Sequence, residues 1–95
     1  MKNKYIMNRS KEEIIANILT AVNEPVNITM IMYEARLSYA QLKMYIKYLE
    51  EKELIHKTQD RRWIVTDIGR VYLNQYEALT KILNSEPLVI SQSIA

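Results

Sequence analysis

The side chains best suited to chemistry lie between Arg36 and Leu49, a stretch that contains no acidic residue. Within it Gln41, Met44 and Lys47 recur at the three-residue spacing that places side chains on one face of a helix. An amide can form paired hydrogen bonds, methionine offers an apolar contact, and lysine neutralises anions. The stretch therefore predicts a polar, basic helix face that could meet a polyanion. The simpler alternative is a solvated face that keeps the domain soluble.

The chain lacks the residue combinations that enzymes and metal sites need. It has no cysteine, which excludes disulfides, zinc-thiolate sites and thiol nucleophiles. His56 is its single histidine. The adjacent acids Glu12–Glu13 and Glu50–Glu51 point to different sides of their helices, which does not suit paired acid–base catalysis. Gly69 is the only glycine, so a glycine-rich phosphate loop is excluded. We expect no catalytic residue, no metal and no cofactor, and hence no enzyme.

Positive charge is concentrated in two segments, although the net charge is only +2. Residues 1–11 carry four cations and no acid, and residues 36–62 carry seven cations against four acids. Residues 12–35, between them, carry four acids and no cation. This distribution favours an anionic partner. We expect residues 1–9 to form a flexible basic arm, which either follows an anionic surface or is a frayed terminus.

The length of 95 residues predicts one small domain, whose thin core would gain from a partner subunit. No apolar run approaches the ~18 residues of a membrane span. No short apolar stretch near Met1 resembles a secretory signal. We therefore expect a cytoplasmic protein.

Capping signals and hydrophobic periodicity predict three helices in the first part of the chain. Ser10 and Glu13 form a capping box ahead of a helix near residues 11–22. Asn27 or Thr29 caps a short second helix, which ends at a turn formed by Arg36 and Leu37. Ser38 caps a third helix near residues 39–52. The apolar stripe of this third helix should face the core, and it comprises Leu42, Tyr45, Ile46 and Leu49.

Two short strands and a long helix are predicted in the second part of the chain. The strands span residues 54–58 and 62–66, with Trp63 as a core anchor, and the polar tip between them contains neither glycine nor proline. Thr66 caps a helix that runs from residue 67 to about residue 84. The order of three helices, a hairpin and a further helix is typical of a winged helix-turn-helix. The predicted fold class is mostly α (α+β), with residues 10–66 as the winged-helix domain, 67–85 as a dimerisation helix and 86–95 as a tail.

The last helix carries more apolar surface than one small domain could cover. Its stripe follows the alternating four- and three-residue rhythm of a coiled-coil seam, with further apolar residues beside it. We predict that the stripe pairs with its symmetry mate in a two-fold homodimer. The alternative is that the helix folds back onto the first helix of its own chain. The predicted interface residues are Ile68, Tyr72, Gln75, Tyr76, Leu79, Ile82 and Leu83.

The central part of the chain resembles an archaeal winged-helix family of small basic DNA-binding proteins and regulators. The resemblance covers roughly residues 10–83 and includes Val65–Gly69, which corresponds to the Leu-Thr-x-x-Gly that usually begins the last helix. The matching residues of the central block are Ile31, Met32, Tyr33, Ala35, Leu37, Ser38, Tyr39, Tyr45, Ile46, Leu49, Leu54 and Ile55.

The resemblance implies a recognition helix, a hairpin wing and a long dimerising helix. The function that it implies is binding of double-stranded DNA as a homodimer, most simply as a transcription regulator associated with the nucleoid. Two alternatives stay open, a chromatin-like protein that coats DNA and a winged-helix module that binds another protein. At the hairpin, charges that protect edge strands from aggregation are an equal alternative to DNA contacts. The residues expected to contact DNA are Ser38, Tyr39, Gln41, Lys43, Met44, Lys47, Lys57, Arg61 and Arg62.

Overall fold

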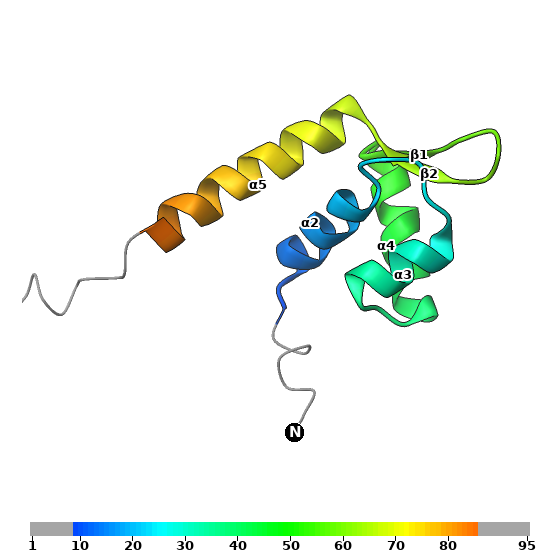
Figure 1. The fold of residues 1–95 in the computed structure, drawn as a ribbon, viewed down its shortest axis with the longest axis horizontal. Coiled ribbons are helices and arrows are strands. Elements are labelled where there is room, and N and C mark those ends of the chain that lie inside the picture. Colours follow the sequence, from blue (N-terminus) through cyan, green and yellow to red (C-terminus); the bar gives the residue numbers. More distant parts are fainter. Residues whose placement is uncertain (1–8, 86–95) are drawn as a thin grey trace, which may run out of the picture.

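The computed structural model describes residues 9–85, which form four helices and a two-stranded antiparallel sheet (Figure 1). In chain order the elements are α2 (Lys11–Ala21), α3 (Ile28–Ala35), α4 (Tyr39–Glu51), β1 (Ile55–Lys57), β2 (Trp63–Val65) and α5 (Asp67–Ser85). The mostly helical fold class and the order of elements agree with the sequence prediction. Most of the predicted basic arm (residues 1–8) and the predicted tail lie outside the described residues.

The helices begin where the sequence predicted, because polar side chains cap their free N–H groups. The Ser10 hydroxyl accepts from the backbone N–H of Glu13 at 3.0 Å, and Ser38 forms a complete capping box with Gln41. Of the two candidates for α3, Asn27 is the cap, and its side chain accepts from the Met30 N–H at 2.8 Å. The strands are one residue shorter at each end than predicted.

The core lies where α2, α3 and α4 meet the inner face of the hairpin. Its fully buried side chains come from each of these elements and include Ile18, Leu19, Ile31, Leu42, Leu49 and Ile55. Trp63 is buried as predicted, and Tyr45 packs half-buried against the same cluster. Packing these side chains together removes apolar surface from water, which fixes the angle at which α4 lies across the domain.

The hairpin is joined to the body of the domain through Val26, in the loop between α2 and α3. β1 and β2 pair with Ile55 opposite Val65 and Lys57 opposite Trp63. On its other edge Trp63 exchanges two backbone hydrogen bonds with Val26: the Val26 N–H donates at 3.1 Å and the Trp63 N–H at 2.8 Å. The loop therefore acts as a short third strand, and it holds the hairpin in a fixed position beside α4.

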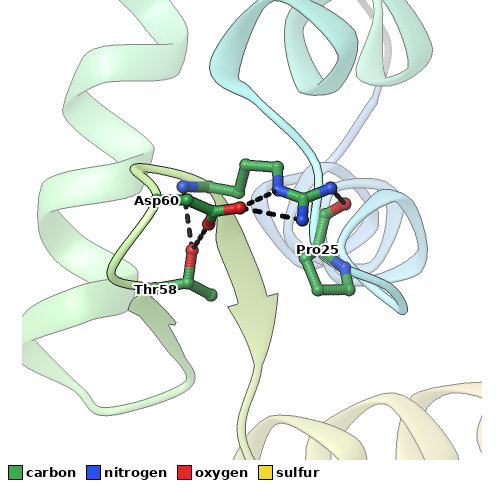
Figure 2. Close-up of polar contacts among 4 residues, drawn as sticks. Pro25, Thr58 and Asp60 are labelled. Carbon is green, nitrogen blue, oxygen red and sulfur yellow. Dashed lines mark hydrogen bonds and ion pairs between the residues drawn. The ribbon is translucent and has the colours of Figure 1, made fainter.

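The tip of the hairpin is ordered by polar contacts in place of a glycine turn (Figure 2). Arg61 takes a left-handed conformation, with φ 68°, that glycine adopts more easily. The Thr58 hydroxyl donates to the Asp60 carboxylate, and Arg62 donates to the other carboxylate oxygen at 2.9 Å and to the carbonyl of Pro25 at 3.4 Å. The hydrogen bonds from Thr58 and Arg62 lower the pKa of Asp60 below its usual value.

The final helix, α5, starts against the hairpin and then runs past α2, and its far half projects away from the other helices (Figure 1). The Thr66 hydroxyl caps it by accepting from the Gly69 N–H at 3.0 Å. Tyr72 packs against the core, and its hydroxyl donates to the backbone carbonyl of Glu12 at 3.4 Å. Across residues 9–85, no helix combines the length and apolarity that a membrane span needs.

Candidate nucleic-acid interface

The outward face of α4 is exposed to solvent and largely polar. Leu42, Ile46 and Leu49 are buried, so the opposite side of the helix must point into solvent. That side presents Met44, which is 73% exposed, together with Lys47 and the small residue Ala40. A small residue and a flexible apolar side chain at the centre of an otherwise polar face allow another molecule to approach the helix closely.

One flank of this face meets the hairpin in a groove of about 320 Å³. Lys43 and Lys57 lie in it with their ammonium groups over aromatic rings. The Lys43 Nζ is 5.5 Å from the centre of the Tyr39 ring, and the Lys57 Nζ is 5.6 Å from a ring centre of Trp63. The structure thus brings together residues from two predicted parts of the interface. The groove is lined by Ile28, Tyr39, Lys43, Ile46, Lys47, Glu50, Lys57 and Trp63.

The opposite flank of α4 meets the start of α2 at Tyr48. The Nζ of Lys11 lies 4.7 Å from the centre of the Tyr48 ring, and the Nζ of Lys52 lies 5.7 Å from it. Beside them Met44 and Tyr45 complete a shallow pocket of about 220 Å³ with Lys11 and Tyr48. Sequence reasoning did not group these residues into one cluster. The four-residue spacing of Tyr48 and Lys52, which matches that of Tyr39 and Lys43, was the available signal.

The lysines of both flanks have no carboxylate partner within 4.0 Å among residues 9–85. Among residues 9–85 the one ion pair within 4.0 Å joins Arg62 to Asp60, at 2.9 Å on the hairpin tip. In the same part of the chain, no three histidine, cysteine, aspartate or glutamate side chains are grouped so as to hold a metal ion. The face therefore offers unneutralised cations and hydrogen-bond donors, which suit an anionic partner.

The remaining residues predicted to contact DNA differ in how available their side chains are. The Ser38 hydroxyl and the Gln41 side-chain oxygen are used in the cap of α4, which leaves the amide NH₂ of Gln41 for an outside partner. Arg62 is turned back onto Asp60 and Pro25, whereas Arg61 is exposed at the hairpin tip. The available groups thus lie mainly on α4.

Arg9, at the end of the predicted arm, points inward. Its guanidinium donates to the side-chain oxygen of Asn17 at 2.9 Å and to the carbonyls of Ala35 and Arg36 at 2.6 and 2.8 Å. These two carbonyls stand at the end of α3, where Arg36 is left-handed with φ 55°. Arg9 therefore caps the turn between α3 and α4.

The predicted dimer stripe of α5 is divided between two environments. Tyr72 and Tyr76 stack with ring centres 6.5 Å apart and are half-buried against their own chain. Burial, followed by the carboxylate of Glu12, raises the pKa of Tyr72 above its usual value; burial and then Glu13 raise that of Tyr76. Leu79 and Leu83, further along, are 60% and 75% exposed. The two tyrosines are partly covered, as the fold-back alternative expected, whereas Ile68 at the start of the stripe is 53% exposed and the far end is open.

The sequence profile of the winged helix-turn-helix family matches residues 8–84. This chain belongs to that family. By their order in the chain, α3 and α4 correspond to the helix-turn-helix and the β1–β2 hairpin corresponds to the wing. The fold expected from the sequence is thereby confirmed.

Two relatives of this winged helix-turn-helix protein are uncharacterised proteins of the archaeon Methanocaldococcus jannaschii. One is 36% identical over 81 residues, which cover 83% of this chain and 81% of the relative. The other is 37% identical over 76 residues, which cover 79% of this chain and 36% of the relative, so the match spans about a third of that longer protein. The archaeal resemblance predicted from the central block is confirmed.

A solved structure shares the fold of this chain. The crystal structure of Sso10a-2, a DNA-binding protein from Sulfolobus solfataricus, superposes with a TM-score of 0.68 and 26% sequence identity. The match covers 78% of this chain and 81% of Sso10a-2. The similarity therefore extends over most of both chains.

Proposed function

We propose that this winged helix-turn-helix protein binds double-stranded DNA as a homodimer and acts at the nucleoid as a transcription regulator. The recognition helix α4 enters the major groove, and the wing lies along the adjacent backbone. The observation that carries the proposal is the outward face of α4, where exposed lysines without acidic partners surround Met44 and Ala40. The likeness to Sso10a-2, itself a DNA-binding protein, supports the same function.

The side chains of this face other than lysine favour reading of sequence over simple coating. Met44 and Tyr39 can contact the methyl group of thymine, and the free amide NH₂ of Gln41 can donate to a base acceptor. Lysines stand mostly on the flanks of the face, where phosphates would be met. A coating protein depends on phosphate contacts alone, and its affinity would fall more steeply with salt.

The exposed part of α5 supports the homodimer. Leu79 and Leu83 lie on the half of the helix that projects from the domain, with Val71 59% exposed nearer its start. Apolar side chains in such a row gain about 25 cal/mol for each Å² removed from water, which a second copy of the same helix can provide. In a dimer that binds a two-fold site, the two α4 helices would enter successive major grooves about 34 Å apart.

The test is selection from a pool of random-sequence duplexes over a series of salt concentrations, with sequencing of the retained DNA. The proposal predicts enrichment of a short palindromic site and affinity that survives moderate salt. Salt-sensitive retention without enrichment would assign the protein to DNA coating. No retention even at low salt would contradict DNA binding and would favour a module that binds another protein.

A further inference from the structure

We propose that α4 holds the phosphates of both DNA strands that border the major groove, through tyrosine–lysine pairs on its two opposite flanks. One flank carries Tyr39 and Lys43, supported by Lys57 of the wing. The other carries Tyr48 and Lys52, supported by Lys11 at the start of α2. This inference rests on the proposed binding of duplex DNA and adds to it a second phosphate site, the cluster of Lys11, Tyr48 and Lys52.

The positions of the two pairs follow from helix geometry. Within each pair the lysine follows the tyrosine by four residues, which places both side chains on the same side of the helix, with Lys52 as the C-cap residue directly after α4. Tyr39 and Tyr48 are nine residues apart. A helix turns about 100° per residue, so their side chains leave α4 about 180° apart. Tyr39, Lys43 and Tyr48 are therefore placed by the backbone of α4, and Lys52 is placed by its position as the residue that ends the helix.

The outward face stands midway between the flanks. Leu42, Ile46 and Leu49 point to the core, and Met44 points the opposite way into solvent. An α-helix with its side chains is about 10–12 Å across, and the major groove of DNA is about 12 Å wide between two phosphate walls. When Met44 faces the floor of the groove, one flank of α4 must face each wall.

An aromatic ring can hold a lysine side chain in position for a phosphate without neutralising it, as a carboxylate would. The ring attracts the ammonium group through its negative face and holds the long side chain in place. The N–H groups that point away from the ring stay free to donate to a phosphate, and the ring, unlike a carboxylate, does not neutralise the charge. Lys11 and Lys52 are held in this way over Tyr48, at 4.7 and 5.7 Å from the ring centre. Less side-chain entropy is then lost when a phosphate binds.

Acidic residues lie close to both flanks but do not neutralise these lysines. Glu12 follows Lys11 in the chain, Glu51 precedes Lys52, and Glu50 lines the groove beside the wing. None of the lysines of the two flanks lies within 4.0 Å of a carboxylate oxygen in the described part of the chain. Both flanks are therefore available to phosphates in the arrangement that the structure shows.

The experiment measures affinity for a duplex of about 25 base pairs as a function of salt, for the wild type and for Lys11→Met, Lys52→Met and the double variant. Each lost phosphate contact lowers the magnitude of the slope of log K against log salt by about 0.9. The double variant loses two contacts in each of the two subunits, so its slope should fall by about 3.6 for each bound dimer. Lys81→Met, on α5, removes one exposed cation away from both flanks and should leave the slope unchanged. The double variant with the slope and affinity of the wild type would overturn the proposal.

Two further measurements separate the phosphate site from a structural role. Tyr48→Leu removes the ring but no charge, so it should weaken binding and keep the slope, whereas Tyr48→Phe should bind like the wild type. Interference mapping with ethylated phosphates should show that Lys11 and Lys52 contact one strand and Lys43 and Lys57 the other. Contacts confined to one strand would overturn the two-strand arrangement. A wild-type protein that binds no duplex would instead refute the proposed function itself.

Discussion

Gly69 at the start of α5 lies against the backbone of Leu54, which ends the loop between α4 and the wing. A Cβ atom on Gly69 would stand 2.2 Å from the carbonyl oxygen of Leu54 and 2.5 Å from a methyl carbon of Val65. The same carbonyl accepts from the Thr66 N–H at 3.0 Å, so it cannot move away freely. The position therefore requires glycine because α5 must approach the wing closely.

Gly69→Ala should destabilise the protein. Alanine is better than glycine in a helix by about 1 kcal/mol, but overpacking against fixed backbone costs about 1–3 kcal/mol, so the clash should outweigh the helix preference. Chemical denaturation of the variant checks this. Asn74→Ala, at an exposed position of the same helix, is the control and should unfold at or above the wild-type midpoint. A Gly69→Ala variant as stable as this control would contradict the close approach.

Arg9→Met should loosen the turn between α3 and α4. Methionine keeps much of the length of the side chain but cannot donate to the carbonyls of Ala35 and Arg36, and hydrogen bonds from charged groups contribute about 1.5–3 kcal/mol each at most. We expect a loss of about 1–3 kcal/mol in the free energy of unfolding. The free energy of unfolding of Arg9→Lys should lie between those of the wild type and Arg9→Met, because one ammonium group cannot reproduce the forked geometry of the guanidinium.

The outcome that would contradict this role of Arg9 is equal stability of Arg9→Met and Lys81→Met. The latter removes a cation from the surface of α5 and no contact to the turn. Hydrogen exchange adds a local readout, because the N–H of Leu37 donates to the Met32 carbonyl at 3.1 Å in this turn. That amide should exchange faster in Arg9→Met than in either the wild type or the control.

The double variant Leu79→Glu/Leu83→Glu should be monomeric. Two carboxylates on the projecting half of α5 would face each other across the proposed two-fold axis, and burying them costs more than the apolar contact contributes. Light scattering should give the mass of one chain, 11.3 kDa, for the variant and twice the mass of one chain for the wild type. Because a monomer engages only one half-site, affinity for a palindromic duplex should fall by about 10²-fold or more.

Asn74→Glu is the matched control for this variant, since it adds a charge to an exposed position of α5 outside the predicted interface. It should remain dimeric. A wild type that is monomeric at concentrations well above those of the DNA titrations would contradict the dimer. Packing of α5 against its own chain would then be the only role of the apolar stripe.

Tyr72 should make the stability of the protein sensitive to alkaline pH. Its raised pKa means that the folded state favours the neutral phenol, first through burial and then through Glu12. The contribution is therefore fully present below the usual tyrosine pKa of about 10 and is lost as pH rises through the higher folded value. Tyr72→Phe cannot ionise, so the difference in unfolding free energy between variant and wild type should shift in favour of the variant above pH ~10. A difference independent of pH would contradict the assignment.

Local signals made much of this fold predictable from the sequence. Ser10, Asn27 and Ser38 precede apolar periodic segments, and a capping side chain acts only on its own helix, so its effect can be read without the rest of the fold. The same holds for the exposed face of α4, because burial of one helix side dictates exposure of the other. The winged arrangement follows from the order of these elements.

Three of the contacts that sequence reasoning missed join distant parts of the chain. Arg9 reaches the end of α3, Val26 pairs with Trp63, and Lys11 covers Tyr48; none of these partners is adjacent in sequence. The left-handed residues Arg36, Glu53 and Arg61 were also hidden, since no glycine marks them. Their conformations are held by caps and by polar contacts that exist only in the folded domain. The extent to which the apolar stripe of α5 is buried likewise depends on the position of α2 in the folded domain.

The most direct test of DNA binding through α4 is a titration of duplex DNA with Met44→Glu. Met44 is 73% exposed, so the substitution should leave folding intact, which a thermal melt verifies. A carboxylate in the middle of the outward face would be brought against the groove and its phosphates. We predict a loss of affinity of at least tenfold relative to the wild type, while Asn74→Glu, with the same change of charge on α5, binds within about twofold. Equal binding by the two variants would show that DNA does not meet the protein at α4 and would contradict the account.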